Sequence, residues 1–289
     1  MSALEQARAH YEAGEFGKAR AAALEALAGA PDDVELLSVA GRAGVETGAD
    51  DAVEQLGRVT QLQPDSADAW HDLGEGLLAD GRDGEAADAF RKALELDPDD
   101  EVALTHLGHA EFAAGSEGGV AHLEQAAERG GGMSTAAISL VEMYRAMGQH
   151  EDALAAAQKV LDAEPSDVVA ALDVAELSLE TGRLDEALAA FERIREMEDL
   201  PEHEVYALHG MIQVELRRDN ADRARELAKE AAQVDGYGRT AGVLAHFEPP
   251  EDGEPPSRED VDAALTESMK EHRRLHAEDR RLLAEDLIG

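Results

Sequence analysis

A pattern of small and apolar residues recurs along this 289-residue chain, with a period of about 34 residues, and it constrains the fold more than any other feature. The clearest copy spans residues 67–100, where one expected helix ends at Gly81 and a second ends at Pro98. The positions that carry the pattern in this copy are Trp70, Leu73, Gly74, Leu77, Ala86, Phe90, Ala93 and Leu94.

The pattern predicts antiparallel pairs of helices, because small residues let two helices approach closely while large apolar ones fill the space left between those two helices. One pair cannot bury its apolar face alone, so such pairs must stack. Three copies depart from the pattern. The fourth ends in three glycines at 130–132, the sixth has an insertion around residues 199–201, and the seventh has Asp219 where the others have a turn glycine. The expected units span residues 1–33, 34–66, 67–100, 101–133, 134–167, 168–204 and 205–238.

The spacing of Trp70, Leu73-Gly74, Ala86, Phe90 and Pro98 resembles the tetratricopeptide repeat, with Leu77 where that family usually has tyrosine. The resemblance covers all the predicted units. It implies an all-α fold, an α-solenoid in which about seven helix-turn-helix units form a right-handed superhelix. It also implies that the first helix of each unit lines a concave wall, and that the protein binds other proteins.

Three segments are expected. Residues 1–247 form the solenoid, with a short capping helix at 239–247. Residues 248–256 are an acidic, proline-rich linker. Residues 257–289 form an amphipathic helix whose apolar stripe includes Val261 and Leu265, and whose basic residues Arg273, Arg274, Arg280 and Arg281 share a face. This helix either docks on an acidic solenoid (its own or a partner subunit's), stays solvated or binds an external partner.

The charge is strongly negative, with 64 acidic against 26 basic residues and a formal net charge of −38. Concentrated salt relieves such self-repulsion, since the Debye length falls to about 3 Å at 1 M. We interpret the composition as that of a halophile, with an acidic protein from a high-GC mesophile as the alternative. Nucleic acid and membranes are poor partners for this surface, and the lack of a long apolar run predicts a cytoplasmic protein.

The candidate binding site is a stripe of equivalent positions on the first helices, suited to an amphipathic helix or an extended peptide with basic residues beside its apolar anchors. The alternative is that these side chains pack between neighbouring helices. The stripe consists of Tyr11, Val45, Leu78, Phe112, Arg145, Leu179 and Leu216.

Four polar residues on the first helices of units three and four are also expected to converge: His71, Glu75, His106 and His109. We assign them to partner binding as ordinary polar residues of the groove. Neutral imidazoles with a carboxylate are the alternative zinc ligands. The chain has no cysteine, which excludes disulfides and thiolate chemistry, and we predict no cofactor and no resident metal.

The sequence therefore predicts a non-catalytic scaffold or assembly factor that binds protein segments in an acidic–apolar groove. One alternative is a homo-oligomeric subunit that assembles through its C-terminal helix. A second is a sensor or enzyme built on a histidine-bound metal.

Overall fold

The computed structural model describes residues 2–116, 118–131, 135–197, 201–235, 240–247, 257–267 and 269–270. Every regular element in these ranges is a helix, and no helix among them is long and apolar enough to cross a membrane. The chain divides into two compact units, Met1–Gly130 and Gly131–Gly289. The division falls inside the run of three glycines at which the sequence departs from its repeat.

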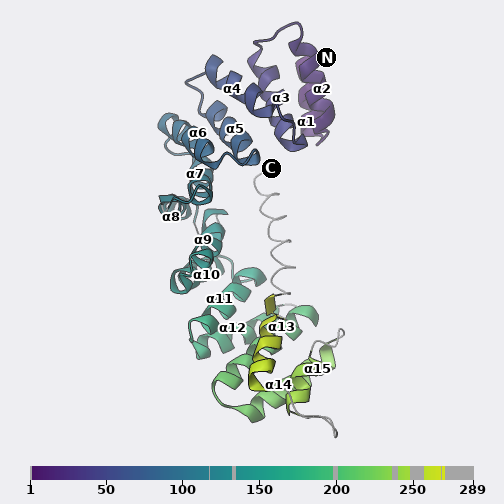
Figure 1. Cartoon of the computed structure of the whole chain (residues 1–289), viewed down its shortest axis with the longest axis vertical. Helices are drawn as coiled ribbons and strands as arrows, with labels where there is room; N and C mark the ends of the chain where they lie inside the picture. Colours follow the sequence, from purple (N-terminus) through teal and green to yellow (C-terminus); the bar gives the residue numbers. More distant parts are fainter. Residues whose placement is uncertain are drawn as a thin grey trace. The chain divides into compact units, whose positions relative to one another are not determined.

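The first unit contains four helical hairpins, each made of two consecutive helices (Figure 1). The helices are α1 (Ala3–Glu12), α2 (Phe16–Leu27), α3 (Val34–Thr47), α4 (Ala52–Leu62), α5 (Ala67–Ala79), α6 (Asp83–Leu96), α7 (Glu101–Ala113) and α8 (Gly118–Gly130). Each hairpin packs on the next one along the chain.

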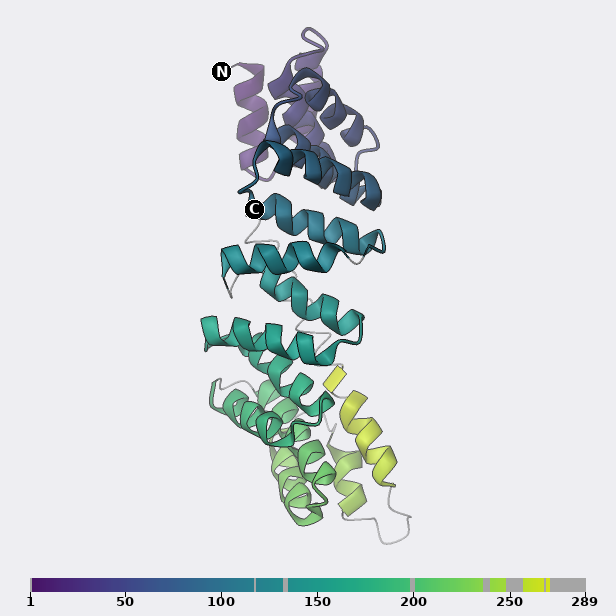
Figure 2. The same cartoon turned by 90° about the vertical axis from the view of Figure 1, so that its left-hand side faces the viewer.

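The second unit, taken by itself, contains three hairpins of the same kind among its described residues (Figure 2). Its helices are α9 (Thr135–Ala146), α10 (His150–Ala163), α11 (Val168–Glu180), α12 (Leu184–Met197), α13 (Pro201–Arg217), α14 (Ala221–Val234) and α15 (Ala241–Phe247). Residues 258–267 form a further helix. The predicted α-solenoid of helical hairpins is confirmed. The rest of the C-terminal helix and the linker at 248–256 lie outside the described residues.

Glycine on the first helix sets how closely the two helices of a hairpin approach. A Cβ added at Gly74 would lie 2.6 Å from the Phe90 ring, and one added at Gly41 would lie 2.6 Å from Leu56. Gly108 stands in the same relation to Leu123. The recurring small residue therefore makes room for the large side chain of the second helix.

The turns inside the hairpins use the left-handed backbone conformation. Gly48 and Gly81 have φ of 64° and 70°, a region that side chains with a Cβ rarely enter. In the last hairpin Asp219 takes this conformation instead, with φ of 59°. An aspartate tolerates it better than most residues, and its carboxylate makes a contact described below.

Candidate functional site

An open, polar cavity lies among the first three hairpins of the first unit. It has a volume of about 520 Å³ and is lined by residues of α1, α3, α4 and α5, including Tyr11, Ser38, Arg42 and Asp72. The Arg42 guanidinium lies over the Tyr11 ring, 5.0 Å from its centroid, and its Nε is 3.8 Å from Asp72 Oδ1. Ser38 Oγ donates to Asp72 Oδ2 over 3.3 Å. Burial raises the pKa of Asp72, and Arg42 opposes this rise.

Four stripe residues belong to the first unit, and all four are half-buried. Tyr11 lines the cavity. Val45 lies close to Gly76 on α5, and Leu78 packs against the core around Phe90, so these two contribute to packing between hairpins. Only part of each of these two side chains is therefore accessible to a ligand.

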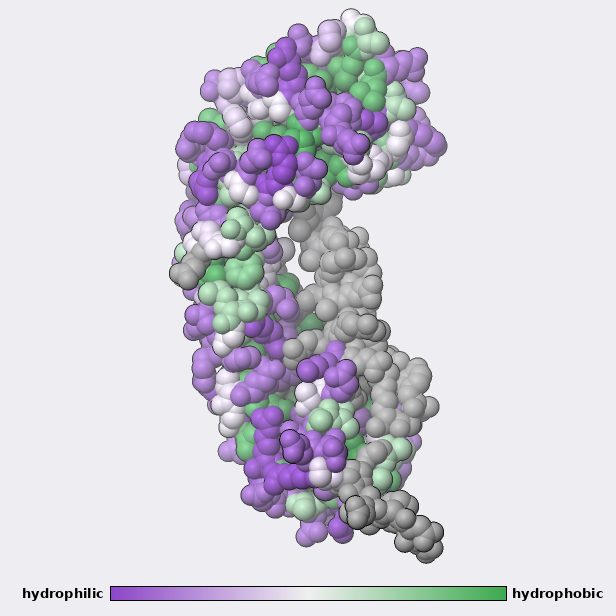
Figure 3. Space-filling view, in the orientation of Figure 1, coloured by the Kyte–Doolittle hydropathy of each residue, from purple (hydrophilic) through white to green (hydrophobic). Residues whose placement is uncertain are grey.

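Much of the surface in view is hydrophilic, in agreement with the high share of charged residues in the sequence (Figure 3).

The remaining stripe residues, in the second unit, are more deeply buried. Leu179 and Leu216 are buried, and the Arg145 side chain is only 10% exposed. Arg145 Nη2 lies 3.3 Å from Asp173 Oδ1 and 3.4 Å from Glu176 Oε2, two carboxylates of α11 that are themselves buried. The Tyr206 hydroxyl on α13 also donates to Glu176, and burial raises the Tyr206 pKa well above its ordinary value. These contacts join α9, α11 and α13 through buried charges.

A C-terminal helix of the same chain packs beside α13, the first helix of the last hairpin. The described C-terminal residues, 257–267 and 269–270, are called the docked segment below. Its apolar residues Val261, Leu265 and Met269 are 1%, 0% and 6% exposed. They recur every four residues and therefore share one face of the helix. The yellow helix of Figure 1 is this segment, beside α13.

Hydrogen bonds fix the position of the docked segment on α13. Gln213 Nε2 donates to Thr266 Oγ1 over 2.8 Å and to the Asp262 carbonyl oxygen over 3.2 Å. At the start of the helix, Arg258 Nη1 lies 2.8 Å from Asp219 Oδ1 and its other terminal nitrogen donates to the Leu216 carbonyl oxygen. Asp219, which replaces the turn glycine, thus supplies the acceptor for the first arginine of the helix.

Sequence reasoning did not select Gln213 or Arg258. Gln213 holds the repeat position at which earlier units carry Arg8, Arg42, Glu75, His109, Glu142 and Glu176, all of them ionisable. The neutral amide of Gln213 is therefore the sequence feature that could have indicated a different partner at this position, because an amide donates to a carbonyl oxygen without bringing a charge. Val261 and Leu265 belong to the apolar face that the sequence predicts for the C-terminal helix. Their burial agrees with the docking of this helix on the chain's own solenoid.

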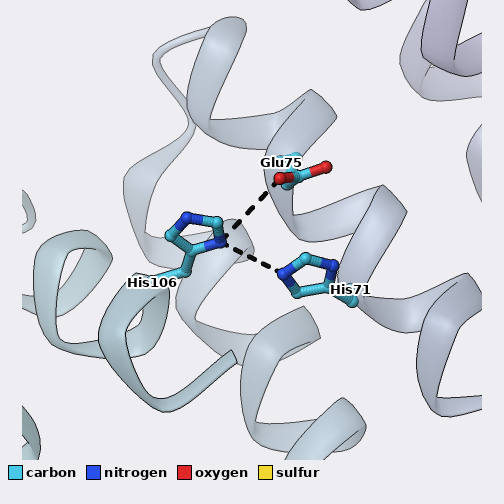
Figure 4. Close-up of side chains that lie close together, drawn as sticks. All are labelled: His71, Glu75 and His106. Atoms are coloured by element: carbon cyan, nitrogen blue, oxygen red, sulfur yellow. Dashed lines mark hydrogen bonds and ion pairs between the residues drawn. The ribbon is translucent and has the colours of Figure 1, made fainter. Parts of the chain in front are cut away.

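Two histidines and a glutamate meet between α5 and α7 (Figure 4). His71 Nε2 lies 3.1 Å from His106 Nδ1, and Glu75 Oε1 lies 3.9 Å from the same His106 nitrogen. The two imidazole planes are nearly parallel, 7° apart, with 5.2 Å between ring centroids, so the rings meet edge to edge. The Phe90 ring lies 5.3 Å from that of His106. Of the four residues expected to converge, these three bring their ligand atoms together. His109 is not a member of that group.

The surroundings keep His106 neutral. Burial lowers the pKa of His106 to about 4, and the neighbouring His71 and His109 add to this effect. Burial also raises the pKa of Glu75, while His71 opposes the rise. His106 is therefore an uncharged imidazole near neutral pH, with its Nδ1 directed at the other two residues.

The comparisons with known families agree with the fold. Tetratricopeptide repeat models match residues 4–52, 47–101 and 144–212, together more than half of the chain. The chain therefore belongs to the tetratricopeptide repeat family, whose members are generally protein-interaction scaffolds. No curated protein sequence matches it significantly.

Several solved structures share this fold at low sequence identity. The C-terminal part of a TPR repeat-containing protein from Cytophaga hutchinsonii is 13% identical, with a TM-score of 0.70 over 83% of this chain and 99% of that one. A tetratricopeptide repeat protein from Parabacteroides merdae is 14% identical, with a TM-score of 0.54 over 84% and 96%. YrrB, described as a TPR protein with an unusual peptide-binding site, is 20% identical, with a TM-score of 0.52 over 65% and 96%.

Proposed function

We propose that this protein is a non-catalytic scaffold that binds an amphipathic helix of a partner protein on α13, the first helix of its last hairpin. The observation that carries the proposal is the docked segment. It is an amphipathic helix with apolar anchors at three positions four residues apart, Val261, Leu265 and Met269. A surface that accepts this helix accepts others with the same anchors.

The contacts define the ligand further. A partner helix needs an arginine or lysine three residues before its first apolar anchor, where Arg258 meets Asp219. It also needs a small hydroxyl residue just after the second anchor, where Thr266 meets Gln213. The chain's own helix then competes with the partner, and partner binding requires that the docked segment leave α13.

The open cavity of the first unit supports a second contact for the same partner or another one. Its lining combines the aromatic ring of Tyr11 with Arg42 and acidic residues such as Asp68 and Asp72. Tyr11 lines this cavity. We propose that the exposed parts of Val45, Leu78 and Phe112 extend the contact along the first helices, together with the polar residues His71, Glu75, His106 and His109. We also propose that the protein works in a salt-rich cytoplasm, where salt would screen the self-repulsion of its net charge of −38.

A second candidate function is homo-oligomeric assembly, in which the docked segment occupies α13 of another copy. The docked segment can make the same contacts with α13 of its own chain or of another copy. The reason is that residues 248–256 connect it to α15, and a proline-rich linker of this length can pass between copies. Light scattering separates the two. A monomeric mass at micromolar concentration supports the scaffold, and a stable dimer supports assembly.

Leu265→Asp in the full chain tests the scaffold proposal. The buried charge is expected to detach the docked segment, so that a labelled peptide of residues 257–289 binds about 100-fold more tightly to this variant than to the unaltered chain. The reason is that the tethered helix competes at an effective concentration of about a millimolar. Fluorescence anisotropy measures both affinities.

Ala264→Asp is the matched control, since it adds the same charge to the exposed face of the same helix. It is expected to leave the weak binding of the unaltered chain unchanged. Equal affinities in all three proteins would contradict competition by the docked segment.

A further inference from the structure

We propose that His71, Glu75 and His106 form a binding site for one divalent transition-metal ion of the zinc class. Every pair of the three ligand atoms lies within 4.8 Å. This inference is independent of the proposed function of the second unit, because all three residues belong to the first.

The repeat itself brings these ligands together. His71 and Glu75 are four residues apart on α5 and therefore lie on the same side of that helix. His106 is on α7, the first helix of the next hairpin, which contacts α5 directly. A metal ion here would join two consecutive hairpins of the stack.

The distances between the three ligand atoms can be compared with those in a tetrahedral zinc site. Ligands in a tetrahedral zinc site lie about 2.0–2.2 Å from the metal, which places them roughly 3.3–3.5 Å from one another. His71 Nε2 and His106 Nδ1, at 3.1 Å, are already near this separation. The glutamate oxygen, 3.9 Å from His106 and within 4.8 Å of His71, must move inward by up to about 1.5 Å to reach the same roughly tetrahedral spacing.

The ligand set selects the class of metal. Two imidazoles and a carboxylate suit zinc, cobalt, nickel and copper, whereas calcium and magnesium prefer oxygen ligands alone. Three protein ligands leave a fourth position for water or for a side chain of a bound partner. The Glu75 side chain is 37% exposed, so an ion can reach the site from solvent.

A hydrogen bond between the two imidazoles is the alternative explanation of their contact. In that case one ring nitrogen donates to the other and no ion is needed. The two explanations differ in whether a metal binds with defined stoichiometry and geometry, which a titration of the full chain can decide.

The test is titration of the full chain with Zn²⁺ and, separately, Co²⁺, in excess Mg²⁺ so that surface carboxylates are already occupied. We expect one tight site per chain, and intense visible absorption bands typical of four-coordinate Co²⁺. Zn²⁺ at 100 times its dissociation constant is expected to raise Tm by roughly 5–8 °C.

Single variants assign the ligands. His71→Gln and His106→Gln are each expected to weaken Co²⁺ binding by at least about 100-fold, more than loss of a residue that only supports a ligand. His122→Gln is the matched control: His122 lies on α8, where it contacts Glu111, and its replacement should leave affinity unchanged. Circular dichroism confirms that each variant is folded.

Three results would overturn the proposal. They are the absence of stoichiometric binding in excess Mg²⁺, affinity unaffected by His71→Gln, and weak six-coordinate Co²⁺ bands that indicate water and surface carboxylates. His71 is half-buried, so its variant keeps the test decisive even if His106→Gln does not fold.

Discussion

Replacing Arg145 with alanine is expected to lower the free energy of unfolding by about 3–5 kcal/mol, because it leaves buried carboxylates without their cation. Asp173 and Glu176 have side chains 8% and 5% exposed, and Arg145 Nη2 contacts both. Urea unfolding of the full chain, monitored by circular dichroism, measures the change.

Arg183→Ala is the control for Arg145. Arg183 also pairs with two glutamates, Glu151 and Glu186, but its side chain is 45% exposed. Water replaces these contacts, so a loss below about 1 kcal/mol is expected. Equal losses in the two variants would show that the Arg145 contacts are not buried in solution, and Arg145 would then be free to contact a partner.

Phe90→Ala is expected to lower the free energy of unfolding of the first unit by about 3–5 kcal/mol. The ring is fully buried and fills the space above Gly74, so its removal leaves a cavity that the rigid helix backbone cannot close. Amide hydrogen exchange localises the effect, with the largest loss of protection expected in α5, α6 and α7.

Leu96→Ala at the end of the same helix is the control for Phe90. Leu96 is 40% exposed and is expected to change stability by less than about 0.5 kcal/mol. Protection lost uniformly along the chain, with no maximum near α6, would contradict the nearest-neighbour stability expected of stacked hairpins.

Most of the fold could be predicted from the sequence because each hairpin repeats the same local rules. Gly74 and Phe90 indicate one close helix pair, and the turn glycine and the proline after the second helix mark its ends. The same period singled out Asp219 as an exception, and its left-handed backbone agrees with its place in the repeat.

The candidate site was less predictable, because accessibility depends on contacts distant in sequence. Leu78 and Leu216 hold equivalent positions, yet Leu216 is buried, and its carbonyl oxygen accepts a hydrogen bond from Arg258 of the docked segment. The sequence marks Arg145 as the charged member of the stripe, but the carboxylates that pair with it come from the next hairpin. Similarly, helical spacing groups His106 with His109, whereas packing groups His106 with His71 and Glu75.

The most direct test of the account is a cross-link between α13 and the docked segment. The chain has no cysteine, so Gln213→Cys with Thr266→Cys introduces the only two thiols. A short bis-maleimide suits this pair because the native contact runs through a long glutamine side chain. Gln213→Cys with Ala264→Cys, on the exposed face of the helix, is the control pair.

We expect a cross-link within single chains, in higher yield than for the control pair. We also expect that the cross-linked protein no longer binds the labelled peptide of residues 257–289. Peptide binding unaffected by the cross-link would contradict the claim that the docked segment occupies the partner site. Cross-links formed only between two chains would instead assign the contact to assembly.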